Sequence, residues 1–257
     1  MSVRISPTAP KPNILTSTPS DTRPPLAPGD RLSRAEFERR YRAHPEIKKA
    51  ELIQGVVHIP SPTHFRNHGV PHLMVNTWVG IYVAHTPGVL AADNTTVLLD
   101  NENVVQPDAL LRLDEKLGGS SHVTEDDFLA GPPELVFEIA ASSASYDMHV
   151  KKRVYARTGV QEYIALQMYE GRLDWFILRE GVYENLTPDE QGVLHSEVFP
   201  GLWLDAKALL TGDLKKMLDV LQQGLASKAH AAFAAHLTSL LTNQQTEAAD
   251  TSPGPQK

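Results

Sequence analysis

The stretch 134-ELVFEIAASSASYDMHVKKRVY-155 begins with the pattern of a buried strand and ends with that of a helix. Its apolar run, residues 135–141, is interrupted by one charged residue, Glu138. A lone carboxylate in an apolar strand costs free energy unless a positive group compensates its charge. Lys151 and Lys152 follow on the predicted helix, so a compensating cation is close in the sequence. The functional interpretation of the chain depends on what meets Glu138.

Composition limits the class of protein. The 257 residues include 41% hydrophobic residues, enough to bury a substantial core, and no cysteine, which excludes disulfides and thiolate metal sites and fits a reducing cytosol. No apolar run approaches the length of a membrane span, and the N-terminal sequence lacks the apolar block of a signal peptide. We therefore expect a cytoplasmic protein without membrane contacts. The net charge of −7 argues mildly against broad, non-specific nucleic-acid binding, but it does not exclude a nuclease, because an acidic metal site itself contributes negative charge.

The chain divides into one folded unit with two polar ends. Residues 1–30 are rich in Pro, Ser and Thr and predict a disordered arm, and residues 243–257 predict a disordered tail. We expect the folded domain at residues 31–212. Helices at 213–242 carry an apolar stripe that predicts packing on the domain or, alternatively, on a homodimer partner.

The N-terminal third contains sequence signals for two helices and a hairpin turn. Ser33 begins a capping-box pattern and predicts a helix. Gln54-Gly55 predicts a hairpin turn between two short strands. Ser61 and Pro62 predict the start of a second helix, which Pro71 should kink or restart.

The middle of the chain is rich in strands, and helices flank it. A polar loop is expected at 114–133. The stretch 146-YDMHVKKRVYARTG-159 predicts a helix, with Gly159 just past its last residue. This arrangement predicts an α/β or α+β domain built on a mixed sheet. The predicted strands are 88–93, 95–100, 104–113, 134–140, 160–168 and 172–178, and the last helices are 214–225 and 228–241.

Two carboxylates and a lysine suggest a chemistry. Asp108 begins one apolar strand and Glu138 lies in the next, so both can point to one end of the sheet if these strands are neighbours. Two carboxylates at such close range repel each other unless a divalent cation lies between them, and oxygen ligands suit Mg²⁺ or Mn²⁺. Beside a phosphodiester, such an ion polarises a phosphoryl oxygen and lowers the pKa of a bound water. A lysine ammonium could orient that water or neutralise developing charge.

An ordered series of motifs supports the same chemistry. The chain resembles the PD-(D/E)XK nuclease superfamily and, within it, the Uma2-like family of restriction endonucleases, over about residues 33–210. The resemblance implies a restriction-endonuclease-like fold, in which helices flank a mixed β-sheet. The motifs are 51-ELIQGVVHIPSPTHFRNHG-69, 104-VVQPDALL-111, 132-PPELVFEIAASS-143 and 198-VFPGLWLDAKALL-210.

The resemblance also implies roles for particular residues. Asp108 and Glu138 match the two acidic metal ligands of the superfamily. Ala140 stands where the superfamily generally has its lysine, and Lys151, on the following helix, matches the shifted lysine of this family. Glu51 matches an N-terminal acidic residue that helps to hold the metal or a water.

Function follows from these roles. The resemblance implies a Mg²⁺- or Mn²⁺-dependent endonuclease acting on DNA, with Lys151, Glu51, Asp108 and Glu138 as catalytic residues. His68 matches a recurrent histidine, and with Lys152 it is a candidate for substrate binding. The alternative is a catalytically inactive nuclease-like domain that binds nucleic acid or a protein.

Plainer interpretations compete with each assignment. Asp108 and Glu138 could cap loops or pair with arginines. Lys151 could be a surface lysine paired with Asp147 at i, i+4, and Glu51 an exposed strand residue. His68 has histidines four residues away on each side, which is zinc-like spacing, but Pro71 interrupts that helix.

Overall fold

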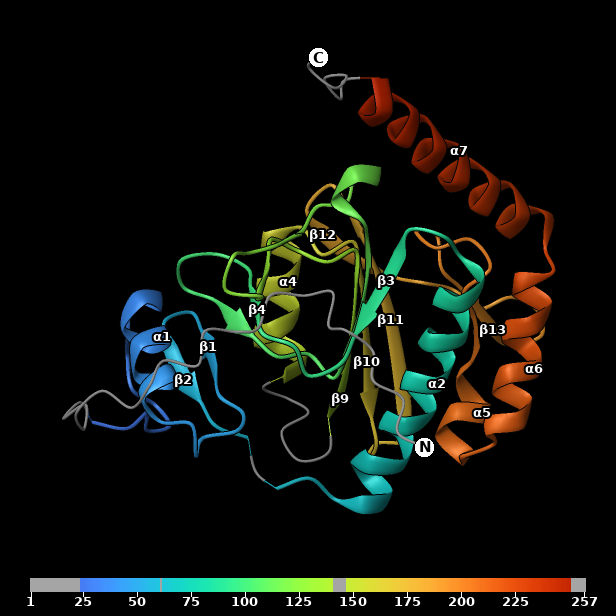
Figure 1. The fold of residues 1–257 in the computed structure, drawn as a ribbon. Coiled ribbons are helices and arrows are strands. Elements are labelled where there is room, and N and C mark those ends of the chain that lie inside the picture. The colour runs from blue at the N-terminus through green and yellow to red at the C-terminus, as the bar shows by residue number, and fades with distance from the viewer. Residues whose placement is uncertain (1–23, 61, 141–146, 251–257) are drawn as a thin grey trace, which may run out of the picture.

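The computed structural model describes residues 24–60, 62–140 and 147–250, and Figure 1 gives the arrangement of their helices and strands. The helices are α1 (Arg34–Ala43), α2 (Val70–His85), α4 (Lys152–Thr158), α5 (Ala206–Thr211), α6 (Leu214–Leu225) and α7 (Lys228–Asp250), with short helical turns η1 (Phe65–Gly69), η2 (Glu115–Leu117) and η3 (Asp147–Lys151). The strands are β1 (Glu51–Ile53), β2 (Val56–His58), β3 (Val89–Ala92), β4 (Val97–Leu98), β5 (Val104–Val105), β6 (Ala109–Leu113), β7 (His122–Val123), β8 (Leu129–Ala130), β9 (Leu135–Ala140), β10 (Glu162–Gln167), β11 (Arg172–Arg179), β12 (Val182–Asn185), β13 (Val193–His195) and β14 (Trp203–Asp205).

Two mixed six-stranded sheets organise the fold. The longer strands form one sheet with the order β12-β11-β10-β9-β6-β3. The shorter strands form the other sheet, with the order β2-β1-β5-β4-β8-β7. We call them the main sheet and the small sheet. The predicted mixed sheet flanked by helices is confirmed.

The main sheet is covered on both faces. Its central strands β9 and β10 run parallel, and all six residues of each are buried. Continuous apolar runs of this kind are typical of strands that have helices on both sides. Helices α2, α5 and α6 lie on one face, and α4 lies on the other (Figure 1).

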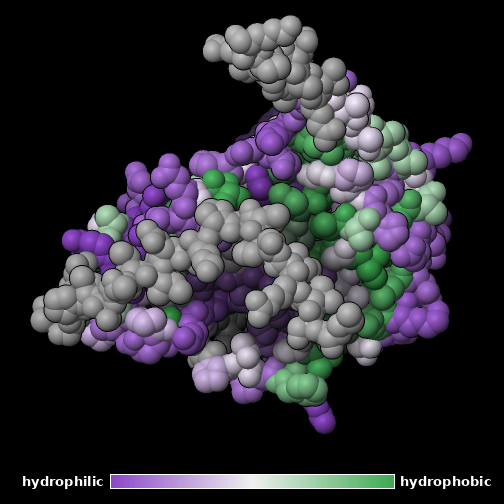
Figure 2. All heavy atoms as spheres, in the orientation of Figure 1, coloured by the Kyte–Doolittle hydropathy of each residue, from purple (hydrophilic) through white to green (hydrophobic). Residues whose placement is uncertain are grey.

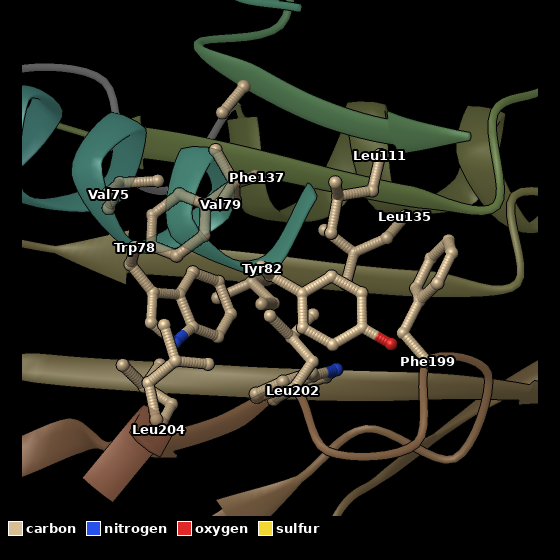
Figure 3. Packing of buried hydrophobic residues seen from close by; sticks show 14 of the residues in the cluster. Val75, Trp78, Val79, Tyr82, Leu111, Leu135, Phe137, Phe199, Leu202 and Leu204 are labelled. Atoms are coloured by element: carbon tan, nitrogen blue, oxygen red, sulfur yellow. The ribbon is translucent and has the colours of Figure 1, made fainter. Parts of the chain in front are cut away.

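Aromatic side chains fill the core on the α2 face. Trp78 and Tyr82 of α2 pack against Phe137 of β9, together with leucines of β6 and of the C-terminal segment (Figure 3). The Trp78 indole N–H donates to the carbonyl of Trp203 at 2.9 Å, and the Tyr82 hydroxyl donates to the carbonyl of Pro200 at 3.0 Å. These two bonds satisfy the polar atoms of buried aromatic rings and fasten the C-terminal segment to α2.

One chain segment joins the two sheets. Residues 104–113 were predicted as a single strand, and this prediction is wrong: β5 belongs to the small sheet and β6 to the main sheet. Pro107 lies at the break, because proline has no N–H to donate to a ladder. The crossing puts Asp108 at the start of β6, where the sheets meet.

Several local predictions are confirmed. The Ser33 hydroxyl accepts from the Glu36 N–H at 3.3 Å, as a helix N-cap should. Gln54 and Gly55 have φ angles of 52° and 71°, the left-handed pair of a tight hairpin turn. The helix does restart at Pro71, which lies in the first turn of α2.

Other local predictions are wrong or lie outside the described residues. Pro62 does not begin a helix. The helical turn that leads into α2 begins only at Phe65 and is π-helical. Ser61 lies outside the described residues. The predicted loop 114–133 contains η2 and the paired strands β7 and β8, which are too short for a visible sequence pattern.

The C-terminal helices pack on the domain. Met217 and Leu221 of α6 and Leu237 of α7 belong to the core on the α2 face. Helix α7 continues to Asp250, past the predicted end of the helical region at residue 242. A homodimer seam on these helices stays a prediction. None of the helices in the described ranges is long and apolar enough to cross a membrane.

Hydrophobic and hydrophilic residues occupy different parts of the surface. In the view of Figure 2, hydrophobic residues (green) gather along the side that carries α2. Hydrophilic residues (purple) lie on the α1 side and at the centre of this face. The polar centre lies between the parts of the molecule built on the two sheets.

Candidate active site

Strand pairing brings the two predicted carboxylates together. The antiparallel register of β6 and β9 aligns Ala109 with Phe137, so Asp108 lies opposite Glu138. Directly opposed residues of an antiparallel pair point to the same face of the sheet. The Ile139 N–H donates to Oδ2 of Asp108 at 2.8 Å, which fixes the aspartate against the neighbouring strand.

Lysine 151 is what meets Glu138. Its Nζ donates to Oε1 of Glu138 at 2.9 Å and lies 2.9 Å from Oε2 of Glu51. Each of the three side chains is at most 8% exposed. The Tyr155 hydroxyl also donates to Oε1 of Glu138, at 2.6 Å. The carboxylate in the apolar strand is therefore held by two donors from α4 and the turn before it.

Glu51 ties this cluster to the small sheet. It lies on β1, and its Oε1 accepts from the Gln106 N–H at 2.7 Å and from Lys151 at 3.0 Å. Gln106 belongs to the crossing segment between the sheets. The buried ion pairs thus join both sheets and the helical segment around Lys151.

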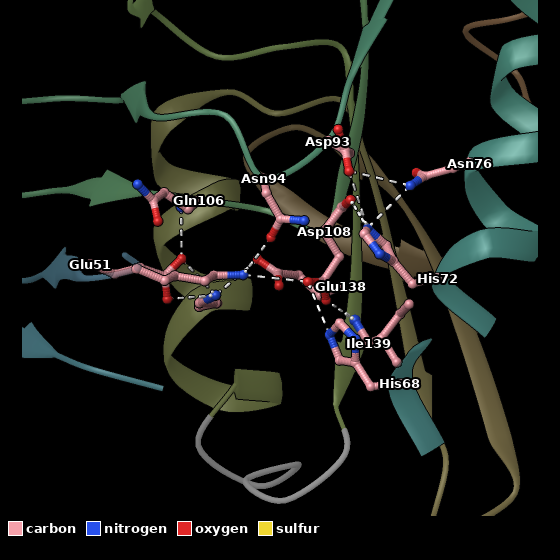
Figure 4. Close-up of polar contacts among 12 residues, drawn as sticks. Glu51, His68, His72, Asn76, Asp93, Asn94, Gln106, Asp108, Glu138 and Ile139 are labelled. Atoms are coloured by element: carbon pink, nitrogen blue, oxygen red, sulfur yellow. Dashed lines mark hydrogen bonds and ion pairs between the residues drawn. The ribbon is translucent and has the colours of Figure 1, made fainter. Parts of the chain in front are cut away.

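A second set of contacts surrounds Asp108, as Figure 4 shows. His68 Nε2 is 3.2 Å from Oδ1 of Asp108, and His72 Nε2 is 2.8 Å from its carbonyl oxygen. Lys49 Nζ is 3.4 Å from the same Oδ1 and donates to Oδ1 of Asn94 at 3.0 Å. The Lys49 side chain is 28% exposed, so it lies nearer to solvent than the carboxylate that it approaches.

Charge and burial shift the two carboxyl pKa values in opposite directions. Burial, together with the charges of Asp108 and Glu51, raises the pKa of Glu138 to about 7, against the lowering effect of Lys151 and Lys49. Burial alone would also raise the pKa of Asp108. The His68 hydrogen bond and the Lys49 charge outweigh burial and hold the pKa of Asp108 well below its usual range. The pair therefore contains one firmly ionised carboxylate and one that takes up a proton near neutrality.

Known proteins with similar sequences or folds indicate the family of this chain. The model of the Uma2 family, described as "Putative restriction endonuclease", matches residues 34–207. The chain belongs to the Uma2 family. A solved structure titled as a putative nuclease belonging to DUF820, from Anabaena variabilis ATCC 29413, is 15% identical with a TM-score of 0.48, and the match covers 63% of this chain and 90% of that chain. No curated protein matches the chain significantly.

The fold of this Uma2 protein gathers most of the predicted residues. Glu51, Asp108, Glu138 and Lys151 lie in one connected cluster, and His68 contacts Asp108. Their catalytic roles stay predictions, because contact alone does not establish chemistry.

Lys152 lies elsewhere. Its Nζ is 3.4 Å from the centre of the Phe176 ring, on the flank of α4 away from Glu138. His64, the first histidine of the zinc-like series, is exposed, and no zinc site forms from that series in the part of the chain that the structure describes. The Asp147 side chain lies outside the described residues, and its pairing with Lys151 stays a prediction.

The plainer interpretation of the carboxylates is also answered. Within residues 24–60, 62–140 and 147–250, the ion-pair partners of Asp108 and Glu138 are Lys49, His68 and Lys151, and none is an arginine. Both acids point inward, and neither caps an exposed loop.

Sequence reasoning missed several members of the cluster. Tyr155 lies four residues after Lys151, and this i, i+4 spacing could have identified it as a neighbour on the same helix face. Lys49 and Gln106 each lie two residues before a predicted site residue, Glu51 and Asp108, and Gln106 is part of the motif 104-VVQPDALL-111, so their proximity in sequence was a signal that could have found them. Asn94, in the left-handed region at φ 46°, gave no signal beyond its residue type.

The donor chemistry fits a hard divalent ion. Asp108 and Glu138 supply carboxylate oxygens beside each other, and burial, with the charges of Asp108 and Glu51, raises the pKa of Glu138, so a bound cation would relieve the cost of its ionised form. Among the described residues, no three His, Asp or Glu side chains already have the arrangement of a metal site.

Replacement of Lys151 should destabilise the protein. Lys151→Met leaves Glu51 and Glu138 buried beside each other without their shared cation, and we expect a loss of about 3–5 kcal/mol in the free energy of unfolding at pH 8. Urea denaturation measures this loss, with Lys152→Met as the matched control, expected to lose less than about 1 kcal/mol. Equal losses for the two variants would contradict the ion-pair assignment.

The pH dependence of stability should change in Glu138→Gln. A carboxyl whose pKa rises from 4.5 to about 7 on folding keeps its proton in the folded state when the unfolded state has lost it. Stability therefore falls as pH rises from about 4.5 to 7 and levels off above. Unfolding titrations in EDTA should give a shallower fall in the variant, and Glu162, whose pKa burial also raises to about 7, accounts for the remainder. Exposed Glu184→Gln should keep the wild-type slope; an unchanged slope in Glu138→Gln would refute the assignment.

Proposed function

We propose that this protein is a divalent-metal-dependent endonuclease that hydrolyses phosphodiester bonds of DNA. The observation that carries the proposal is the convergence in one buried cluster of Asp108, which directly precedes β6, Glu138 of β9 and Lys151 of the η3 turn. Membership of the Uma2 family, described as "Putative restriction endonuclease", supports the same reaction class.

Asp108 and Glu138 would hold the ion, and Glu51 would assist. A bound Mg²⁺ or Mn²⁺ supplies Lewis-acid polarisation of a phosphoryl oxygen and a water of lowered pKa. Asp108 suits a ligand because its low pKa keeps it ionised. Glu138 suits one because a cation relieves the unfavourable burial of its charge.

Lys151 and Tyr155 would orient the carboxylate and manage charge. Both donate to the same oxygen of Glu138, which leaves the other carboxylate oxygen open for a ligand as far as the described residues are concerned. The Lys151 ammonium, anchored by Glu51, is suited to position the attacking water or to neutralise charge that develops on phosphorus.

His68 and Lys49 would act on the substrate side. Their side chains are 13% and 28% exposed, more than those of the buried cluster, and both approach Oδ1 of Asp108. A positive group at that position would attract a backbone phosphate to the carboxylates. We extend the proposal to a cytoplasmic enzyme that acts as a homodimer when it cuts both strands of a duplex.

A plasmid assay tests the proposed reaction. Purified protein with Mg²⁺ or Mn²⁺ should nick supercoiled DNA, and Asp108→Asn should lower the rate by about 100-fold or more, because the loss of one ligand charge costs several kcal/mol of transition-state stabilisation. Asp126→Asn removes an exposed aspartate, 64% exposed, and should leave the rate unchanged. Equal cleavage by Asp108→Asn and wild type would eliminate the assignment.

A second function is favoured by one observation. Lys151 already occupies the space between Glu51 and Glu138, as it would in a nuclease-like domain that binds without cutting. Such a module would bind nucleic acid or a protein equally well in EDTA and would show no turnover with either metal. Metal-dependent turnover in the plasmid assay rejects it.

A further inference from the structure

A groove lies on the flank of α4 opposite to the buried cluster. Its volume is about 590 Å³, and it is bounded by α4 with the preceding turn on one side and by the β11–β12 hairpin on the other. Lys151 and Lys152 are consecutive, yet Lys151 points into the cluster and Lys152 lies beside the groove. The lining residues are His149, Lys152, Arg153, Ala156, Arg157, Gly181, Val182 and Tyr183.

The groove is electropositive. Lys152, Arg153 and Arg157 carry positive charge, and no carboxylate is among the lining residues. Arg157 donates to Asp100 at 3.1 Å and is partly neutralised, whereas Arg153 is exposed. In a chain with a net charge of −7, this clustering of cations on one groove is a local feature that selects an anion.

The rest of the lining is apolar and shaped. Val182 is 66% exposed, whereas Tyr183 lines the groove from a buried position, with its hydroxyl donating to the carbonyl of Val160 at 2.7 Å. Glu180 and Gly181 turn the hairpin with φ angles of 50° and 81°. Gly181 adds no side chain to the rim of the groove. Cations beside exposed apolar surface suit a ligand that alternates charged groups with carbon-rich ones, as phosphates and sugars do along a nucleic acid.

We propose that this groove binds the phosphodiester backbone of a nucleic acid away from the bond that is cut. The inference rests on the proposed function for its substrate class, and it adds a contact surface that the catalytic cluster does not contain. Helix α4 then serves two purposes: Tyr155 supports Glu138 on one flank, while Arg153 and its neighbours hold the backbone on the other.

Binding in the absence of metal tests the groove directly. A fluorescein-labelled 20-nucleotide DNA duplex, and single-stranded DNA and RNA of the same sequence, are titrated with full-length protein in EDTA at several salt concentrations. Arg153→Glu should weaken binding by about 10-fold or more and lower the slope of log K against log salt by about one or more. The control Lys215→Glu makes the same charge change on α6, at a side chain that is 85% exposed, and should bind like wild type.

Each outcome decides the inference. Equal affinities for Arg153→Glu and Lys215→Glu, or no detectable binding of any oligonucleotide by wild type, would overturn it. Loss of binding confined to RNA or to one strand form supports the groove and identifies its substrate. Because EDTA removes the metal, failure of the plasmid assay with an intact Arg153 effect would reject the nuclease and leave nucleic-acid binding, whereas cleavage without an Arg153 effect would reject only the groove.

Discussion

The ion pairs of one buried lysine hold the candidate site together. Lys151 lies 2.9 Å from both Glu51 and Glu138, and these three residues come from the small sheet, the main sheet and the segment that begins α4. Burial makes each of these charges costly alone, so the cluster is stable only when its members are assembled. The same arrangement keeps an excess of carboxylate over ammonium near Asp108, which is the condition under which a divalent cation is attracted.

The backbone places these charges through two simple devices. Alternation along β9 turns Glu138 toward α4 while Phe137 and Ile139 enter the core on the α2 face. The break at Pro107 moves the chain from the small sheet to the main sheet within a few residues, so Gln106 can hold Glu51 while Asp108 faces Glu138. The polar site therefore lies where the main sheet and the small sheet meet.

Sequence reasoning recovered what local pattern encodes. The motif series that resembles the Uma2 family singled out Asp108, Glu138 and Lys151, which lie together in the structure, and turn chemistry predicted the hairpin at Gln54-Gly55. Long-range packing decides which strands become neighbours. The sequence alone therefore could not show that Asp108 lies opposite Glu138. The approach of Lys49 to Asp108, across 59 positions, has no local signature at all. The strand 104–113 was misjudged because its apolar residues outweighed the signal of one proline.

The location of a bound ion tests the central claim most directly. Crystals grown with Mn²⁺ can be measured for anomalous scattering, which locates manganese without reference to protein chemistry. The account predicts a peak within coordination distance of both Asp108 and Glu138, with Lys151 still in contact with Glu51. Manganese bound only at other surfaces, with Lys151 still bridging Glu51 and Glu138, would contradict it.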